Sequence, residues 1–388
     1  MQFKKVIGQN GVKEKLRMAI RENRVAHTQL FLGPQGSGAL ALAVAYAQYI
    51  NCHNKQEGDS CGTCPSCVKY EKLEHPDLQF IFPTATTNKV SKEPEASKFI
   101  TEWKGYFLQQ KGYVTQSGWY EYLGLGGNKQ GSIFIRDGEQ IVRNLSLKSY
   151  EGGYKVIIIY LPEKMNLQTA NKLLKSLEEP PDNTIFMLVA ERYELILPTI
   201  RSRTQMIKVS PIEKEILKQS LQAKWGESIS SEQADSIAFM SNGSWNEAIE
   251  MVEQADESQF NFTKFREWMR LCYAGSDFYS INQLVQELSR LGKEKQKQFL
   301  VYGLKVIQNS LLVNQQLNDQ VMAMADEKSY FQKFAPFINE ANQSEMYRLV
   351  NDAVYQLERN AHSPILFTHL SFRFIDLLKK GRSRLVKR

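Results

Sequence analysis

Three closely spaced glycines, Gly33, Gly36 and Gly38, form the segment GPQGSG between an apolar run and an alanine-rich stretch. The run at residues 27–32 predicts a strand, and residues 39–50 predict a helix. Glycines at such a junction let backbone N–H groups form a nest for phosphate at the helix N-terminus. The pattern indicates a phosphate-binding loop. For this stretch taken alone, a chance glycine-rich turn is the alternative.

The side chains with which such a loop does chemistry are missing. A complete loop reads G-x-x-x-x-G-K-[ST], in which the lysine reaches the β- and γ-phosphates and the hydroxyl binds Mg²⁺. Ala39 and Leu40 stand at these two positions. The apolar run at 154–161 ends without an acidic residue, Glu163 follows too late, and the run before Glu191 has no Ser, Thr or Asn at its tip. We therefore expect neither ATP hydrolysis nor productive ATP binding here.

Four of the five cysteines gather within a short stretch, as Cys52, Cys61, Cys64 and Cys67. Four thiolates can close a tetrahedron around Zn²⁺ and leave no position for water, so this spacing predicts a structural zinc site over residues 52–67. A redox dithiol is the competing interpretation. His53 is a further candidate ligand, although a surface histidine is expected there. The remaining cysteine, Cys272, is expected to be a small buried apolar residue.

The elements that position these residues alternate between strand and helix. Continuous apolar runs at 154–161 and 184–190 suit buried parallel strands. Between them, residues 167–178 carry an apolar stripe at helical spacing, and the prolines of EEPPDN end that helix. Residues 133–148 indicate a short strand and a helix. The alternation runs to about residue 209, which predicts an α/β domain with a parallel sheet.

The chain of 388 residues is too long for one core, so two or three domains are expected. We predict an α/β domain at 1–210 that contains the zinc module and an irregular, partly helical and mobile insertion at 83–131. A small helical domain at 211–258 and a helical bundle at 259–388 are expected to follow. The family resemblance described below implies that this bundle acts as a collar and oligomerisation domain.

Charge and hydropathy narrow the class of protein. The net charge of +7 is compatible with an anionic partner and equally with ordinary solubility. The sequence contains no apolar run of membrane-spanning length and no signal-peptide pattern, which predicts a cytoplasmic protein. Basic residues crowd the C-terminus, where we expect a frayed, solvated tail, with phosphate contact as the alternative. They are Lys379, Lys380, Arg382, Arg384, Lys387 and Arg388.

Several segments together resemble the clamp-loader AAA+ family. They are VIGQ at 6–9, the HTQLFLGPQGSG loop, the four-cysteine insertion, ANKLLKSLEEPP at 170–181 and LPTIRSR at 197–203. The similarity is strong over residues 1–80 and 133–210 and only general in the helical C-terminal half. In lacking the lysine and the hydroxyl, this sequence resembles the delta-prime branch of the family, whose members typically do not hydrolyse ATP.

The resemblance implies a role for Arg203. The family has a Ser-Arg-Cys motif whose arginine reaches the ATP of a neighbouring subunit as an arginine finger, and here the motif reads Ser202-Arg203-Thr204. A planar, permanently charged guanidinium suits that task. A surface or intramolecular ion pair is the alternative role, and Arg201 lies close enough to be confused with it. A further family arginine, expected to contact phosphate, is replaced by Asn246.

The resemblance therefore implies a stator-like, non-hydrolysing subunit of the DNA polymerase III clamp loader. Its expected partners are gamma/tau-type ATPase and delta subunits, and, within the complex, the sliding clamp and primer–template DNA. Two alternatives stay open: an active AAA+ ATPase, and a zinc-stabilised DNA-binding module without a motor partner. ATPase activity of the isolated chain would favour the first, and tight salt-dependent DNA binding by that chain would favour the second.

Overall fold

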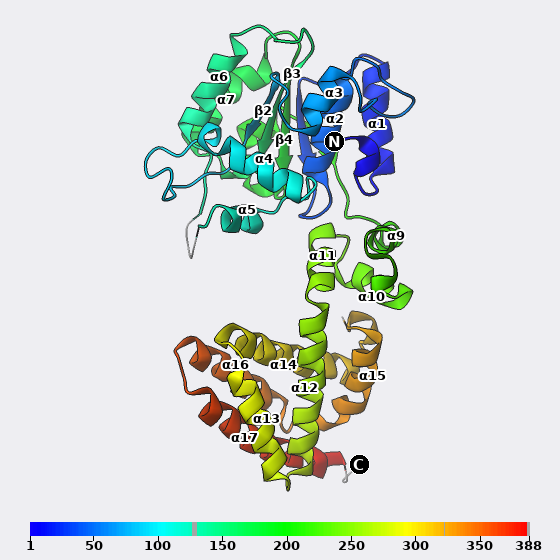
Figure 1. Cartoon of the computed structure of the whole chain (residues 1–388), viewed down its shortest axis with the longest axis vertical. Coiled ribbons are helices and arrows are strands. Elements are labelled where there is room, and N and C mark those ends of the chain that lie inside the picture. The colour runs from blue at the N-terminus through cyan, green and yellow to red at the C-terminus, as the bar shows by residue number, and fades with distance from the viewer. Residues whose placement is uncertain (126–129, 322, 386–388) are drawn as a thin grey trace. The chain divides into compact units, whose positions relative to one another are not determined.

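The computed structural model describes residues 1–125, 130–321 and 323–385 (Figure 1). The chain divides into two compact units, Met1–Ile249 and Glu250–Arg388. Each unit has its own core and is described separately. The additional domain boundary that we expect near residue 210 falls inside the first unit and stays a prediction.

A five-stranded parallel sheet forms the centre of the first unit, with the strand order β2-β3-β4-β1-β5. This confirms the expected α/β class. The predicted strands at 27–32, 154–161 and 184–190 are present, whereas two short strands carry no long apolar run in the sequence. The strands are β1 (Thr28–Leu32), β2 (Leu78–Ile81), β3 (Lys155–Tyr160), β4 (Thr184–Ala190) and β5 (Gln205–Lys208).

Helices flank this sheet, with α6 and α7 on one side of the strands and α1 to α3 on the other (Figure 1). Every residue of α2 is buried, because its small alanines pack closely against β1, β3 and β4. The helices are α1 (Asn10–Arg21), α2 (Ala39–Ile50), α3 (Pro65–Glu71), α4 (Ile100–Gln109), α5 (Gln116–Tyr122), α6 (Ile135–Leu145), α7 (Leu167–Glu178), α8 (Pro198–Arg201), α9 (Lys214–Trp225), α10 (Ser231–Met240) and α11 (Trp245–Glu253).

Helix α7 has the bounds that the sequence predicts, because both of its ends are locally encoded. The side chain of Asn166 accepts a hydrogen bond from the Thr169 N–H at the N-terminus. Pro180 and Pro181 follow its last residues. By contrast, the short strand expected within 133–148 is wrong. Ile133 makes a single bridge to Met165, and the segment then enters α6.

The expected irregular insertion at 83–131 is more ordered than predicted over its described residues. Its two tryptophans are buried near the end of β2: the Trp103 ring stacks on Phe82 at 4.2 Å, and Trp119 meets both rings edge-on. The Trp119 indole N–H donates to the Pro83 carbonyl over 2.9 Å. Aromatic burial of this kind holds α4 and α5 in place. Residues 126–129 lie outside the described residues.

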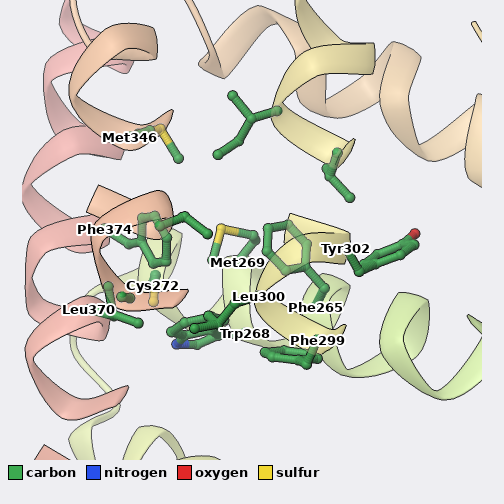
Figure 2. Close-up of a cluster of buried hydrophobic side chains, with 14 of the residues drawn as sticks. Phe265, Trp268, Met269, Cys272, Phe299, Leu300, Tyr302, Met346, Leu370 and Phe374 are labelled. Atoms are coloured by element: carbon green, nitrogen blue, oxygen red, sulfur yellow. The ribbon is translucent and has the colours of Figure 1, made fainter. Parts of the chain in front are cut away.

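The second unit is helical, and its core joins side chains from every helix (Figure 2). Trp268 is fully buried there and donates from its indole nitrogen to Ser371 Oγ over 2.8 Å. Cys272 lies in the same core, which confirms the expected buried position. The helices are α12 (Ala255–Ala274), α13 (Phe278–Arg290), α14 (Lys293–Asn314), α15 (Ala325–Phe334), α16 (Gln343–Glu358) and α17 (Ser363–Leu385).

The expected frayed C-terminal tail is wrong for its described part, which continues α17 as far as Leu385. Lys380 pairs with Glu345, and the Arg382 guanidinium lies 5.3 Å from the centre of the Tyr273 ring. These contacts hold Lys380 and Arg382 against neighbouring helices. Lys387 and Arg388 lie outside the described residues. No helix in the described part of the chain combines the length and hydropathy needed to span a bilayer.

Candidate functional site

The glycine loop lies where the sequence predicts, between the carboxyl end of β1 and the N-terminus of α2. Gly36 has a φ of +79°, and a Cβ there would lie 2.2 Å from Ser244 Oγ, so the backbone requires glycine. Gly38, also at positive φ, is the N-cap residue of α2. Gly33 packs against Val209. The loop keeps the conformation of a strand-to-helix turn that can face an anion.

The two missing functional groups leave an apolar start to α2. Ala39 and Leu40 are both buried, with 7% and 4% of their surface exposed. Neither offers a charge or a hydroxyl, so this loop lacks the side chains that hold the terminal phosphates and Mg²⁺.

Glu163, which follows β3 too late to be expected as a metal ligand, has a structural role in the fold. Leu161 takes a left-handed conformation and turns the chain into a short 3₁₀ helix at Pro162–Lys164. This turn brings the Glu163 carboxylate to the end of β4, where it accepts from the Glu191 and Arg192 N–H groups at 3.1 and 3.4 Å. Its carboxylate therefore caps the end of the neighbouring strand, a role that only the fold brings about.

Two carboxyl groups at this edge of the sheet have raised pKa values. Burial, followed by the negative charge of Glu163, raises the pKa of Glu191 to about 7. Burial also raises the pKa of Glu163. Glu191 lines the pocket beside the glycine loop. Glu191 is therefore in part neutral near pH 7.

The pocket beside the loop is almost filled. Gly33, Gly36 and Gly38 line it together with Tyr160 and with the 112–114 segment of the insertion. The cavity that remains has a volume of about 20 Å³. Pockets for small ligands have about 300–1,000 Å³. Sequence reasoning missed the 112–114 segment, because no periodicity or motif connects it to a loop some 75 residues earlier.

The structure brings the four cysteines together at the start of α3, with all four sulfurs within 4.8 Å of one another. Cys61 Sγ lies 3.6 Å from Cys52 Sγ and 3.9 Å from Cys67 Sγ. A tetrahedron with Zn–S bonds of about 2.3 Å has edges of about 3.8 Å, so the separations suit zinc. They exceed the disulfide length of about 2.05 Å, and all the cysteines are free. His53 is exposed and stands outside this group.

Backbone N–H groups point at the cysteine sulfurs. The Thr63 and Cys64 amides lie 3.5 and 3.3 Å from Cys61 Sγ, and they lower the pKa of that thiol to about 6. The Cys61 amide lies 3.3 Å from Cys52 Sγ, but burial outweighs this contact and raises the pKa of Cys52. Amides aimed at a sulfur favour the thiolate form, which is the form that binds metal.

Arg203 follows the short helix α8, and 29% of its side chain is exposed. Its Nε donates to Glu178 Oε2 over 2.9 Å, and its Nη1 donates to the Thr199 carbonyl over 3.0 Å. Arg201 differs, because its guanidinium lies over the Tyr193 ring at 4.8 Å. Arg203 is not among the residues that line the glycine-loop pocket. Its charge is directed to the surface of the unit.

The sequence profile described as "DNA polymerase III, delta subunit" matches residues 8–213, more than half of the chain. The chain belongs to the DNA polymerase III delta-subunit family. The family match includes the glycine loop, the cysteine group and Arg203, and it ends before α9.

Curated relatives agree with this family. The delta' subunit of Bacillus subtilis DNA polymerase III is 24% identical over 376 residues, which cover 95% of this chain and 96% of that protein. The delta' subunit of Pseudomonas aeruginosa is 28% identical over 178 residues, covering 46% and 41%. The gamma/tau subunit of Mycobacterium tuberculosis is 27% identical over 202 residues, covering 52% and 27%. The chain thus spans less than half the length of the last two relatives.

Proposed function

We propose that this chain is a non-hydrolysing, stator-like subunit of a DNA polymerase III clamp loader. In this role it presents Arg203 to ATP bound by a neighbouring gamma/tau-type subunit. Delta subunits, the sliding clamp and primer–template DNA complete the proposed set of partners. The relatives whose names support this role are the delta' and gamma/tau subunits of DNA polymerase III.

The observation that carries the proposal is the separation of the two halves of an ATPase site. The loop has no lysine and no hydroxyl, and its pocket has room for about one water molecule. Arg203, in contrast, keeps its guanidinium at the surface of the unit. A chain of this kind can stabilise charge on a nucleotide held by another subunit while holding none itself.

The ion pair with Glu178 supports the same role. Glu178 is 58% exposed, so the pair lies in water-accessible surroundings and contributes at most about 1 kcal/mol to folding. Arg203 can therefore exchange this carboxylate for a phosphate at little cost. The bond to the Thr199 carbonyl limits the directions in which the guanidinium points.

The proposal assigns supporting roles to the other parts of the chain. A zinc ion held by Cys52, Cys61, Cys64 and Cys67 has a structural role, because four thiolates leave no open coordination position. The helices from α9 to α11 act as a small lid domain. Helices α12 to α17 act as a collar that joins the subunit to its partners.

The test is the DNA-stimulated ATP turnover of the reconstituted clamp loader. We expect Arg203→Ala to lower turnover by about 10³- to 10⁵-fold if the finger acts at every active site, and by less if other subunits supply their own. Arg201→Ala is the matched control, since it removes the same charge two residues away and should leave turnover near normal. Unchanged turnover in the Arg203→Ala complex would remove the assignment.

Two measurements complete this test. The melting temperature of Arg203→Ala should stay close to that of the wild type, because the lost ion pair is exposed. The isolated wild-type chain should release no phosphate from ATP. Steady phosphate release would instead support the alternative of an active AAA+ ATPase.

A further inference from the structure

The segment Gly112–Val114 lines the pocket beside the glycine loop. Tyr113 and Val114 are 4% and 6% exposed, and both line this pocket. The space left, about 20 Å³, admits about one water molecule. Atoms of this chain therefore take up the volume that the phosphates of a ligand would occupy.

The turn that carries this segment is well defined by local bonds. At the end of α4, the Gly112 N–H donates to the Phe107 carbonyl and the Tyr113 N–H to the Gln110 carbonyl, both over 2.9 Å. Gly112 has a φ of +82°, and a Cβ there would lie only 2.9 Å from Ala41 Cβ. Glycine thus permits both the turn and its close approach to α2.

Tyr113 links three parts of the first unit. Its hydroxyl accepts from the Ile7 N–H over 2.8 Å, and its ring lies 3.1 Å from where a Cβ on Gly38 would stand. Its carbonyl accepts from Asn246 Nδ2 over 2.6 Å. Burial raises the pKa of Tyr113, so its hydroxyl is neutral around pH 7.

The end of β3 also contacts the segment. The Tyr160 hydroxyl donates to the Val114 carbonyl over 3.3 Å. Tyr160 stands where a nucleotide-hydrolysing site would place an acidic residue for Mg²⁺. The glycine loop, the end of β3 and Asn246 are the three places where this sequence departs from an ATP site. All three contact Gly112–Val114.

We infer that Gly112–Val114 is an internal ligand that takes the place of a nucleotide. It bonds the groups around the glycine loop, excludes ATP by volume, and ties α11 to the sheet through Asn246 without any cofactor. The inference rests on the proposed function only in that both require a loop free of nucleotide. It adds that a peptide segment, and not only the missing lysine, closes the site.

The test restores the lysine and the hydroxyl of the glycine loop in two variants. One variant keeps Gly112–Val114 unaltered, and the other carries substitutions that displace this segment. One full-length variant carries Ala39→Lys and Leu40→Thr, and a second adds Gly112→Leu and Tyr113→Ala to displace the turn. Binding of the fluorescent nucleotide mant-ATP with Mg²⁺ is measured for both variants and for the wild type. We expect no binding by the wild type or the first variant. We expect a gain of about tenfold or more for the second, equivalent to at least about 1.4 kcal/mol.

Each outcome separates this inference from the proposed function. Equal binding by both variants would overturn the inference that Gly112–Val114 acts as an internal ligand. It would not contradict the proposed role as a non-hydrolysing subunit. Absence of binding by both folded variants would also overturn the inference, since displacement of the segment would then not open the site. Binding by the wild type would contradict the inference and, if phosphate is released, the proposed function as well.

Hydrogen exchange of the unaltered chain provides an independent measurement in case the fourfold variant does not fold. The Gly112 and Tyr113 amides should exchange slowly in the wild type, because both are buried and hydrogen-bonded. Tyr113→Ala should accelerate this exchange at least about tenfold, whereas the control Tyr150→Ala, at an 82% exposed tyrosine, should not. Exchange at the rate of unfolded chain in the wild type would overturn the inference.

Discussion

Single residues at the edge of the sheet take roles that their sequence positions do not suggest. Glu163 caps the end of β4 instead of holding a metal ion, and Asn246 bonds a backbone carbonyl instead of a phosphate. Tyr160 replaces a carboxylate with a hydroxyl that donates to Val114. In each case the side chain satisfies a backbone group of this chain, and an unpaired buried backbone group would cost about 1–3 kcal/mol.

The raised pKa of Glu191 predicts a pH-dependent stability of the first unit. The group is neutral in the fold, so its contribution is complete below pH 4.5, its ordinary value, and is lost as pH rises through about 7. Glu191→Gln keeps the neutral form at every pH. We expect the variant to gain about 1–3 kcal/mol of unfolding free energy over the wild type between pH 4.5 and pH 8.

Urea unfolding of the two proteins at several pH values measures this difference. Glu194→Gln serves as the control, because this exposed carboxyl lies three residues away. A gap between Glu191→Gln and wild type that stays constant with pH would show that the carboxyl does not titrate in this range.

At the scale of elements, residues 52–67, called here the cysteine turn, connect the N-terminal segment to α2 and α3 by hydrogen bonds. Gln2 Nε2 donates to the Ser60 carbonyl over 2.6 Å. The Phe3 and Lys4 amides both donate to the Asp59 carboxylate over 3.0 Å. The same N-terminal segment supplies the Ile7 amide to Tyr113. A metal that holds this turn would thus also support the closed glycine loop.

Removal of the metal should therefore destabilise the first unit. We expect one Zn²⁺ per chain by elemental analysis, and loss of that zinc in Cys61→Ser. The melting temperature should fall by an amount equivalent to about 2–5 kcal/mol, the range for loss of a cross-link from a small domain. His53→Ala is the control, and it should retain both zinc and stability because His53 stands outside the four-sulfur group. Full stability after complete removal of zinc would contradict a structural role.

At the scale of the whole molecule, two units with separate cores predict two separable unfolding events. The core of the second unit is rich in aromatic rings, and Phe265 and Phe374 lie close to Trp268 (Figure 2). Trp268 meets Phe265, Phe367 and Phe374 edge-on. The first unit depends on its sheet and the cysteine turn. A substitution in the core of one unit should therefore leave the unfolding transition of the other unit unchanged.

Trp268→Ala tests this independence. It should lower the stability of the second unit by about 3–5 kcal/mol, because it opens a large cavity and removes the partner of Ser371. The transition that responds to zinc removal should not move in a calorimetric scan. Tyr279→Ala is the control at a 73% exposed aromatic residue of the same unit. A single transition that shifts as a whole in Trp268→Ala would contradict the two-unit description.

Local sequence patterns were enough to predict the alternating α/β order, the bounds of α2 and α7, the absence of a lysine at the loop and the grouping of four cysteines. These features rest on local physics, since periodicity, caps, prolines and short spacing act within a few residues. Local patterns also explain why the C-terminal half could be assigned as helical and why Cys272 could be placed in a core.

The residues that pack beside the glycine loop and the position of the Glu163 carboxylate became known only from the folded structure. Tyr113 reaches Asn246 across 133 residues of chain, and the left-handed turn at Leu161 carries Glu163 to a neighbouring strand. Such contacts leave no periodic trace in the sequence, because each depends on how separate elements meet in the core. The physical reason is that burial and hydrogen bonding act between neighbours in space, whereas sequence patterns report neighbours along the chain.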